Sequence, residues 1–334
     1  KEPFWDDEAK ALGMGITLHV ATAPQEQANR TLARVREIIV SGPAEFAAVL
    51  GDMLDSPNPV VRSTAMRTAG KDEKLLSNVM ATLQSHTHFL DSVRLRASMS
   101  RSDFWFEDLK TRKLTVYLVL PADRLDTFHR WLRLMIQQAI TVNARNIAYR
   151  PEKPILFMLD EVAALGKMSV IPRAYGLMAG YGMMLWSIVQ NLSQLEEIYG
   201  KGWETFIGNS DVLPYYGSRD CKSGDYCSKR GSSHSSSSSW SPQGGSSSSN
   251  FSTSSSVSES ESDSESDSET KDVVQRALIL PDELMVMRRD EALVLVENLN
   301  PIKAFKVKWF EHPLFRHFGI NLEKIAISTE KRVV

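Results

Sequence analysis

Cysteine is scarce in this sequence. Its 334 residues include two cysteines, Cys221 and Cys227, and no second pair of cysteines or histidines stands at the spacing of metal ligands. One pair of cysteines cannot build a disulfide framework, and this pattern does not predict a zinc site. Such cysteine usage is typical of a reducing compartment, of which the cytoplasm is the usual case.

Long apolar runs and an excess of one charge are also missing. No segment reaches the about 18 consecutive apolar residues that a membrane-spanning helix needs, and no stretch of this sequence has the pattern of a signal peptide. The net charge is −2, so no strong overall field points to nucleic acid or to an anionic membrane. Arginines between residues 30 and 101 could favour DNA or an acidic partner, but interleaved acids favour a solvated surface of mixed charge.

The N-terminal third has the apolar spacing of helices, with Gly70 as a joint inside the longest of them. No alternating strand pattern occurs between residues 20 and 98, so this block is predicted to be all-α. The predicted helices cover residues 4–20, 25–40, 43–54 and 60–89.

The rest of the chain alternates apolar strands with helices. The predicted strands cover residues 113–120, 154–159, 183–189 and 211–216. The predicted helices between them cover residues 125–148, 169–179 and 193–199. This alternation is typical of an α/β fold in which a parallel sheet is covered on both faces.

Residues 231–272 form a Ser-rich tract. From residue 231 to residue 270, 22 of the 40 residues are serine, and the last part alternates serine with Asp or Glu. Such a segment cannot bury enough apolar surface to offset the entropy of ordering, so we predict a disordered loop. Strands are predicted again over residues 292–296 and 303–309, so the loop interrupts one domain.

The sharpest chemical signal is the sequence ILFMLDE, in which a buried strand ends in two adjacent carboxylates, Asp160 and Glu161. In an open α/β sheet, ligands bind beyond the carboxyl ends of the strands. In P-loop nucleotidases the first acid of such a pair holds Mg²⁺, usually through water, and a second acid can orient or deprotonate the attacking water. The alternative is a surface turn that happens to be acidic.

Three further polar residues are candidates. Gln190 ends the next predicted strand, where it can contact a γ-phosphate or the attacking water, or simply cap the strand. Arg219 follows the fourth strand, and it either faces a phosphate, as a sensor or an arginine finger, or pairs with Asp220 or solvent. Arg173 lies at least one turn beyond the acidic pair and leaves the same alternatives open.

A phosphate-binding loop is absent, since the pattern GxxxxGK(S/T) does not occur. Without the backbone N–H groups and the lysine of that loop, the chain should bind ATP poorly. The sequence opens at Lys1 without an initiator Met, and residues 4–12 already have the pattern of the middle of an amphipathic helix. We therefore expect a C-terminal fragment, with the phosphate-binding loop upstream of Phe4.

Long stretches of the sequence carry a resemblance to a known family. The segments are ILFMLDEVAALGKM, AYGLMAGYGMMLWSIVQNLSQLEEIYG and NSDVLPYYGSRD, with KLTVYLVLPADRLDTFHRWLRLMIQQAI before them and LILPDELMVMRRDEALVLVENLNPIKAFKVKWFEHPLF after them. Together they resemble the TraG-type coupling proteins of conjugation and type IV secretion, over nearly the whole chain except the Ser-rich tract. The resemblance implies an α/β fold with a RecA-like P-loop NTPase core, a parallel central sheet and an inserted all-α domain.

The resemblance also implies a domain order. The expected domains are residues 1–20 as part of the nucleotide-binding domain, 21–100 as the all-α domain on the substrate or relaxase side, 101–230 as the RecA-like nucleotide-binding domain, 231–272 as the Ser-rich loop, and 273–334 as the remainder of the nucleotide-binding domain.

Residue roles follow from the same resemblance. Asp160 and Glu161 match the Walker B pair, with Asp160 holding Mg²⁺ through water and Glu161 catalytic, and Gln190 matches the glutamine of the following motif. Apart from the resemblance, Arg219 is expected to bind the cofactor because of its place after the fourth predicted strand. Some relatives carry an arginine finger at the position of Ala179, so the source of a finger stays open here.

Members of the family form homo-hexamers at the cytoplasmic face of the bacterial inner membrane, and a membrane anchor is expected upstream of this chain. They use ATP and Mg²⁺ and work with inner-membrane components of the secretion system. We therefore expect a coupling ATPase subunit that drives relaxase–DNA complexes or effector proteins into the channel, in which this fragment alone is inactive. The alternatives are a non-hydrolysing receptor or adaptor that acts through the all-α domain, and an ATPase without translocation.

Overall fold

The computed structural model of the protein describes residues 3–217, 222–228 and 280–318. They belong to two compact units, unit 1 (Lys1–Ser187) and unit 2 (Ile188–Val334). The division falls inside the expected domain of residues 101–230, and the expected domain limits stay a prediction. The predicted Ser-rich loop lies outside the described residues.

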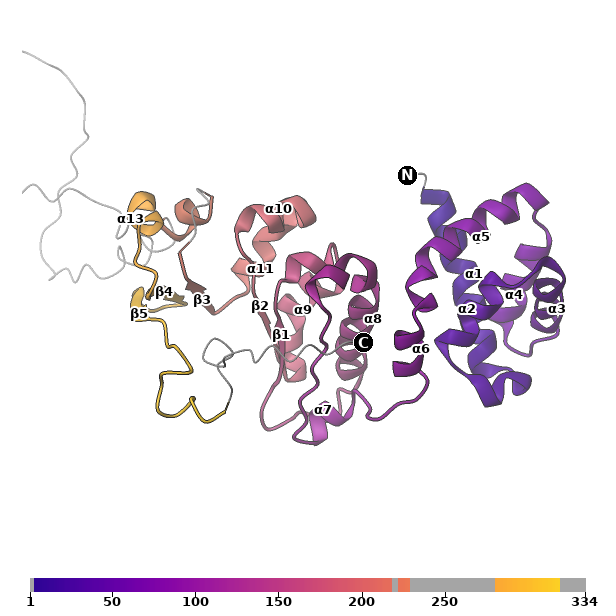
Figure 1. Cartoon of the computed structure of the whole chain (residues 1–334), viewed down its shortest axis with the longest axis horizontal. Helices are drawn as coiled ribbons and strands as arrows, with labels where there is room; N and C mark the ends of the chain where they lie inside the picture. Colours follow the sequence, from indigo (N-terminus) through magenta and orange to yellow (C-terminus); the bar gives the residue numbers. More distant parts are fainter. Residues whose placement is uncertain (1–2, 218–221, 229–279, 319–334) are drawn as a thin grey trace, which may run out of the picture. The chain divides into compact units, whose positions relative to one another are not determined.

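Unit 1 begins with a helical block, residues 3–98, in which no strand occurs (Figure 1). The predicted all-α character of this stretch is therefore confirmed. Its elements are α1 (Pro3–Thr22), η1 (Pro24–Asn29), α2 (Leu32–Val40), α3 (Pro43–Leu54), α4 (Pro59–Ala69), α5 (Glu73–Thr87), η2 (His88–Asp91) and α6 (Val93–Ser98).

Capping residues explain where these helices begin. The side chain of Asn58 accepts a hydrogen bond from the amide of Val60 at the start of α4, as expected for an N-cap. The predicted helix over residues 25–40 is wrong in one respect, because the Thr31 side chain caps Arg34 and starts α2 anew after the short turn η1. Apolar spacing alone does not show this break.

The hydrophobic core of the helical block consists of residues from the block itself. Helix α1 contacts α2, α4 and α5, so it packs within the block. Helices α1 and α4 approach closely, because a Cβ on Gly15 would lie 2.4 Å from the Thr64 Cγ2 atom. The core residues are Ala9, Leu12, Ile16, Val20, Val35, Ile38, Ile39, Phe46, Met53, Val61, Ala65, Val79 and Leu83.

The remainder of unit 1 is an α/β arrangement in which β1 and β2 pair in parallel, from Ile155↔Met183 to Leu159↔Ser187. Helix α8 contacts η4 and α9, and α9 contacts β2. The elements are α7 (Asp108–Thr111), η3 (Ala122–Arg124), α8 (Leu125–Arg145), β1 (Ile155–Leu159), η4 (Val162–Leu165), α9 (Val170–Leu177), η5 (Met178–Tyr181) and β2 (Met183–Ser187).

The predicted strand over residues 113–120 is wrong. These residues alternate between half-buried and exposed, as the pattern suggested, but they pair with no strand in the described part of the chain. Tyr117 is 83% exposed and Val119 is 77% exposed. A β-branched sequence that alternates in polarity predicts which side chains of an extended segment point to each side. A β-strand also needs a neighbouring strand with which its backbone forms hydrogen bonds.

Unit 2 holds an antiparallel sheet in the order β3-β4-β5. The strand predicted over residues 211–216 exists, but its expected place in the parallel sheet is wrong, because β3 pairs antiparallel with β4. Tyr215, Cys227, Leu284, Leu293 and Leu295 form the local core. The elements are α10 (Leu192–Tyr199), η6 (Gly200–Trp203), α11 (Glu204–Gly208), β3 (Val212–Tyr215), α13 (Pro281–Met285), β4 (Glu291–Val296) and β5 (Ile302–Phe305), and residues 222–228 are also helical.

Candidate functional site

The carboxyl ends of β1 and β2 form one edge of the parallel sheet. Leu159 pairs with Ser187 at the last position of the register, so β1 and β2 end side by side. Asp160 and Glu161 follow β1 directly. This is the edge at which open α/β sheets bind their ligands, so the sheet places the acidic pair where the sequence predicted it.

The two acids have different surroundings. Asp160 is exposed, and its carboxylate makes no hydrogen bond or ion pair with the described residues. Glu161 is half-buried and adopts a left-handed backbone, with φ 53° and ψ 52°. A left-handed backbone costs a non-glycine residue about 1 kcal/mol or more and persists only where the surroundings enforce it.

The turn after Glu161 enforces this conformation. The Ala164 amide donates to the Glu161 carbonyl at 2.9 Å, and the Gly166 amide donates to the Ala163 carbonyl at 3.0 Å. Val162 and Leu165, the end residues of η4, are buried. Two apolar anchors and two backbone hydrogen bonds therefore fix the segment that carries the acids.

Arg133 of α8 holds the far side of the same turn. Its guanidinium donates to the carbonyl of Leu165 at 3.1 Å and to that of Lys167 at 2.9 Å. Gly166 lies between these carbonyls with φ 65°, and a Cβ there would come within 3.4 Å of Arg133 Nη1. The positive φ is what favours glycine here, since a Cβ at that distance would make a close to ordinary contact with the guanidinium.

Tyr175 of α9 contacts the end of β2. Its hydroxyl accepts a hydrogen bond from the Ser187 amide at 3.3 Å. Burial raises the pKa of the Tyr175 phenol above its ordinary value. The phenol is therefore neutral at physiological pH and holds the last residue of β2 as an uncharged group.

The other predicted site residues lie on different elements from the acidic pair or outside the described residues. Gln190 is exposed, belongs to unit 2 and precedes Asn191, whose side chain caps α10 by accepting from the Gln194 amide at 2.9 Å. Its proximity to Asp160 and Glu161 stays a prediction. Arg219 lies outside the described residues, and Arg173 and Ala179 are exposed on α9 and η5.

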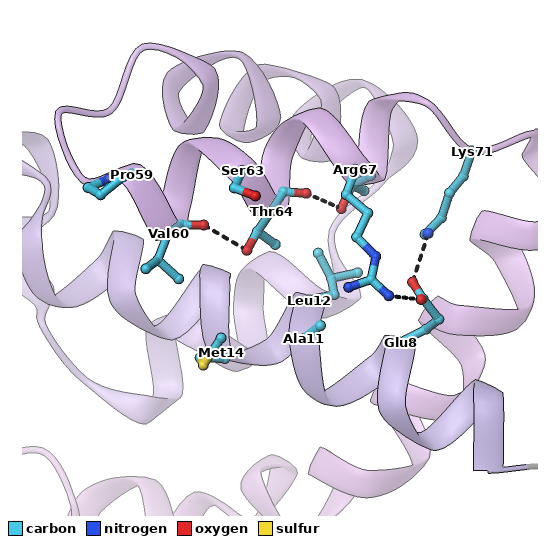
Figure 2. A pocket seen from close by; sticks show the side chains of 11 residues that line it. Glu8, Ala11, Leu12, Met14, Pro59, Val60, Ser63, Thr64, Arg67 and Lys71 are labelled. Atoms are coloured by element: carbon cyan, nitrogen blue, oxygen red, sulfur yellow. Dashed lines mark hydrogen bonds and ion pairs between the residues drawn. The ribbon is translucent and has the colours of Figure 1, made fainter.

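A pocket of about 330 Å³ lies between α1 and α4 in the helical block (Figure 2). The buried carboxylate of Glu8 lies inside it, paired with Arg67 and, at 2.7 Å, with Lys71. Burial, and secondarily the charge of Arg67, lowers the pKa of the Lys71 ammonium. Because the acid and the two cations engage one another, the pocket joins two helices through an ion-pair cluster.

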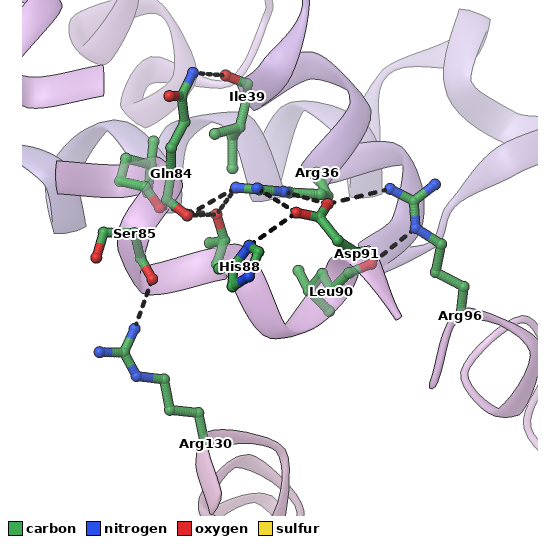
Figure 3. A network of polar contacts seen from close by, with 11 residues as sticks. Arg36, Ile39, Gln84, Ser85, His88, Leu90, Asp91, Arg96 and Arg130 are labelled. Atoms are coloured by element: carbon green, nitrogen blue, oxygen red, sulfur yellow. Dashed lines mark hydrogen bonds and ion pairs between the residues drawn. The ribbon is translucent and has the colours of Figure 1, made fainter. Parts of the chain in front are cut away.

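A second polar cluster joins α2 to the end of α5 (Figure 3). The buried Arg36 guanidinium binds both carboxylate oxygens of Asp91, at 2.8 and 2.6 Å. It also donates to the Gln84 carbonyl and to the Thr87 hydroxyl, each at 2.8 Å. The hydrogen bonds from Arg36 lower the pKa of the Asp91 carboxyl, which is thereby kept charged.

Neither cluster resembles a metal centre. Across residues 3–217, 222–228 and 280–318, no three His, Cys, Asp or Glu side chains gather closely enough to hold a metal ion. A Mg²⁺ ion bound at Asp160 would take its remaining ligands from water or nucleotide, because Mg²⁺ in proteins usually keeps several water ligands. Over the same residues, no helix has the length and apolarity to span a bilayer.

The sequence did not single out Arg133 or Tyr175. Both side chains bind backbone atoms, Arg133 a carbonyl and Tyr175 an amide. Every residue type has a carbonyl, and all but proline have an amide, so the sequence at the other end of such a hydrogen bond does not reveal it. Gly166 was the available hint, because a glycine just beyond an acidic strand end indicates a special backbone or a close approach.

Comparison with sequence families and curated proteins finds clear relatives. A family model described as "Type IV secretory system Conjugative DNA transfer" matches residues 1–332. Protein VirD4 of Agrobacterium fabrum is 32% identical over 164 residues, which are 48% of this chain and 25% of the relative. The Type IV secretion system-coupling protein VirD4 of Bartonella quintana is 24% identical over 312 residues, 92% of this chain and 46% of the relative. The chain thus spans between a quarter and half of these relatives.

Solved structures show the fold. The bacterial conjugative coupling protein TrwB, unbound, matches with a TM-score of 0.61 at 14% identity, over 90% of this chain and 63% of that one. TrwB in complex with ADP and Mg²⁺ also matches with a TM-score of 0.61, at 15% identity, over 93% of this chain and 66% of that one. The predicted fold class is confirmed, namely a RecA-like P-loop NTPase core with a parallel central sheet and an all-α domain.

Proposed function

The chain belongs to the type IV secretory system conjugative DNA transfer family of coupling proteins, and we propose that it is part of an ATPase that drives relaxase-bound DNA or effector proteins into the secretion channel. The observation that supports this most directly is the acidic pair at the carboxyl edge of the β1–β2 sheet. TrwB, which shares the fold, has been solved with ADP and Mg²⁺.

The residues at this edge suit a hydrated magnesium ion. Asp160 presents an exposed carboxylate that no described residue engages, and carboxylate oxygen is a preferred ligand of this hard cation. When bound, Mg²⁺ supplies neutralisation of the charge that develops on a transferring phosphoryl group. Asp160 would hold the ion through water.

Glu161 is the proposed general base. Its backbone is fixed by η4 and by the buried side chains of Val162 and Leu165, so the carboxylate is presented by a rigid turn. From there it would orient the attacking water and accept its proton. Gln190 and Arg219 would contact the γ-phosphate, and no residue is assigned to the phosphate cradle, because GxxxxGK(S/T) does not occur in this sequence.

The proposed partners follow from the family. The helical block would receive a relaxase–DNA complex or an effector protein, while the RecA-like part assembles as a homo-hexamer at the cytoplasmic face of the inner membrane. Inner-membrane components of the secretion system would receive the substrate. A self-contained core, with buried charges paired internally, suits the block for a receptor role.

The experiment introduces Glu161→Gln into the gene of the full-length protein in its host cell. The frequency with which this donor cell transfers a mobilisable plasmid to a recipient is then measured. We expect a loss of at least about 100-fold, since a positioned general base contributes roughly 100- to 10,000-fold. Glu152→Gln is the matched control, because Glu152 is an exposed acid in the loop before β1. Its transfer should equal that of the wild type.

The alternative is a receptor that does not hydrolyse nucleotide. It predicts that Glu161→Gln transfers as well as Glu152→Gln and that substrate still binds the helical block. That result would remove the catalytic role of Glu161 and support the receptor.

A further inference from the structure

Helix α8 contacts the helical block through one arginine and the acidic turn through another. Arg130 donates to the Ser85 carbonyl of α5 at 3.1 Å (Figure 3). Arg133 donates to the carbonyls on both sides of Gly166. The two arginines are three residues apart, which is about one turn of helix. One turn of α8 therefore touches both parts of unit 1.

The contact at Ser85 uses a carbonyl that α5 cannot satisfy by itself. The last four carbonyls of a helix lack an intrahelical partner and carry the negative end of its dipole. Near the end of α5, Gln84 O accepts from Arg36 and Ser85 O accepts from Arg130. Arg130 is thus bound to the same helix terminus that the Arg36–Asp91 cluster organises (Figure 3).

Helix α8 is held along its inner face and at its C-terminal end. Its inner face buries Trp131, Ile136 and Ile140. At its C-terminal end the buried Lys110 ammonium donates to the carbonyls of Asn146, at 2.6 Å, and Tyr149, at 3.1 Å. Because Arg130 and Arg133 stand on one hydrogen-bonded turn of this helix, a displacement of the backbone at Arg130 also displaces the backbone at Arg133.

We propose that α8 mechanically couples the helical block to the turn that carries Asp160 and Glu161. Arg133 is a positioning residue for Glu161, and Arg130 is the contact through which the block acts on α8. A protein or protein–DNA substrate that shifts the end of α5 would then alter the left-handed turn at Glu161. The catalytic meaning of this link rests on the proposed function, whereas the link itself does not.

The test is hydrogen exchange on the full chain, read at the amides of Ala164 and Gly166, which close the turn. Arg133→Met should speed their exchange about tenfold, because two hydrogen bonds from a charged donor are lost. Arg130→Met should speed exchange at the same two amides about threefold, as well as in residues 85–91. Arg173→Met, at an exposed position on α9, should change neither.

An Arg130→Met effect confined to residues 85–91 would overturn the coupling, and unchanged Ala164 and Gly166 exchange in Arg133→Met would overturn the positioning role. Arg133→Lys is the control for a folding defect. It keeps the positive charge but lacks the planar guanidinium that can donate to two carbonyls at once. It should give exchange between the wild type and Arg133→Met. Exchange needs no ATP turnover, so a failed Glu161→Gln transfer test would leave this result intact.

Discussion

The helical block and the β1–β2 sheet bury their apolar residues differently. In the block, side chains such as Met53 and Ile39 are fully enclosed by neighbouring helices. In the sheet, Leu156 and Met158 pair with Met184 and Trp186, and all four are between 45% and 56% exposed. Parallel sheets normally bury both faces. The core of the block is therefore enclosed by residues of the block itself, whereas within the described residues this sheet face is half-exposed.

Charged groups follow the same division. The buried carboxylate of Glu8 and the buried guanidinium of Arg36 have partners inside the block. At the sheet edge, Asp160 is exposed and engages no described residue. The charges buried in the block are thus paired internally, whereas the carboxylate of Asp160, the acid proposed to hold Mg²⁺, is exposed.

The largest expected effect compares two methionines. Met53→Ala in the block should lower the free energy of unfolding by about 2–5 kcal/mol, because it leaves a cavity in an enclosed core. Met158→Ala on the exposed sheet face should change it by less than about 0.5 kcal/mol. Denaturant titration read by hydrogen exchange in α2 and α5 measures the first, and exchange in β1 the second. Equal losses would break the comparison.

A smaller effect is expected from charge. Arg36→Met should destabilise the block by about 2–3 kcal/mol, less than the full value for a buried pair because Asp91 is 39% exposed. Arg173→Met, on exposed α9, should be neutral within about 0.5 kcal/mol. The same exchange measurement in α5 reads both variants. A neutral Arg36→Met would show that the cluster does not support the block.

The smallest effect is a pH dependence confined to the block. His19 is buried, and its Nδ1 has no hydrogen-bond partner among the described residues. Burial lowers the pKa of its imidazole below the ordinary 6.5. The charge of Arg34 lowers this pKa further, while the charges of Glu26 and Asp52 raise it by less than burial lowers it. The unfolded imidazole therefore binds a proton near pH 6 that the folded one does not. Stability should fall as the pH drops from about 7 to 5, by at most about 1.4 kcal/mol per pH unit.

His19→Met should flatten this slope, measured by urea titration at several pH values. The control, His129→Gln on α8, should keep it. A slope that survives in His19→Met would assign the proton uptake to another group.

Most helices could be predicted from the sequence, because apolar spacing and proline breaks report local geometry. Pairing could not, since residues 113–120 and residues 211–216 have the composition of strands but nothing in them specifies a partner or a direction. The division of residues 25–40 depends on the Thr31 cap, which a long apolar pattern hides.

The position of the acidic pair was predictable, because a continuously apolar strand and its end are visible in the sequence. The left-handed backbone of Glu161 was not, since it arises from the burial of Val162 and Leu165 and from the Arg133 contacts. Gln190 falls in the other unit and Arg219 outside the described residues, so their roles remain predictions.

The left-handed backbone at Glu161 has an evolutionary consequence. A glycine would adopt φ 53° without strain, and an asparagine with little, so folding alone favours either of them over glutamate at this position. On the role proposed for Glu161, selection for the carboxylate would hold glutamate there against that preference. In gene copies released from such selection, residue 161 should drift toward glycine or asparagine while Val162 and Leu165 stay apolar, so this one codon would test the proposed role of Glu161.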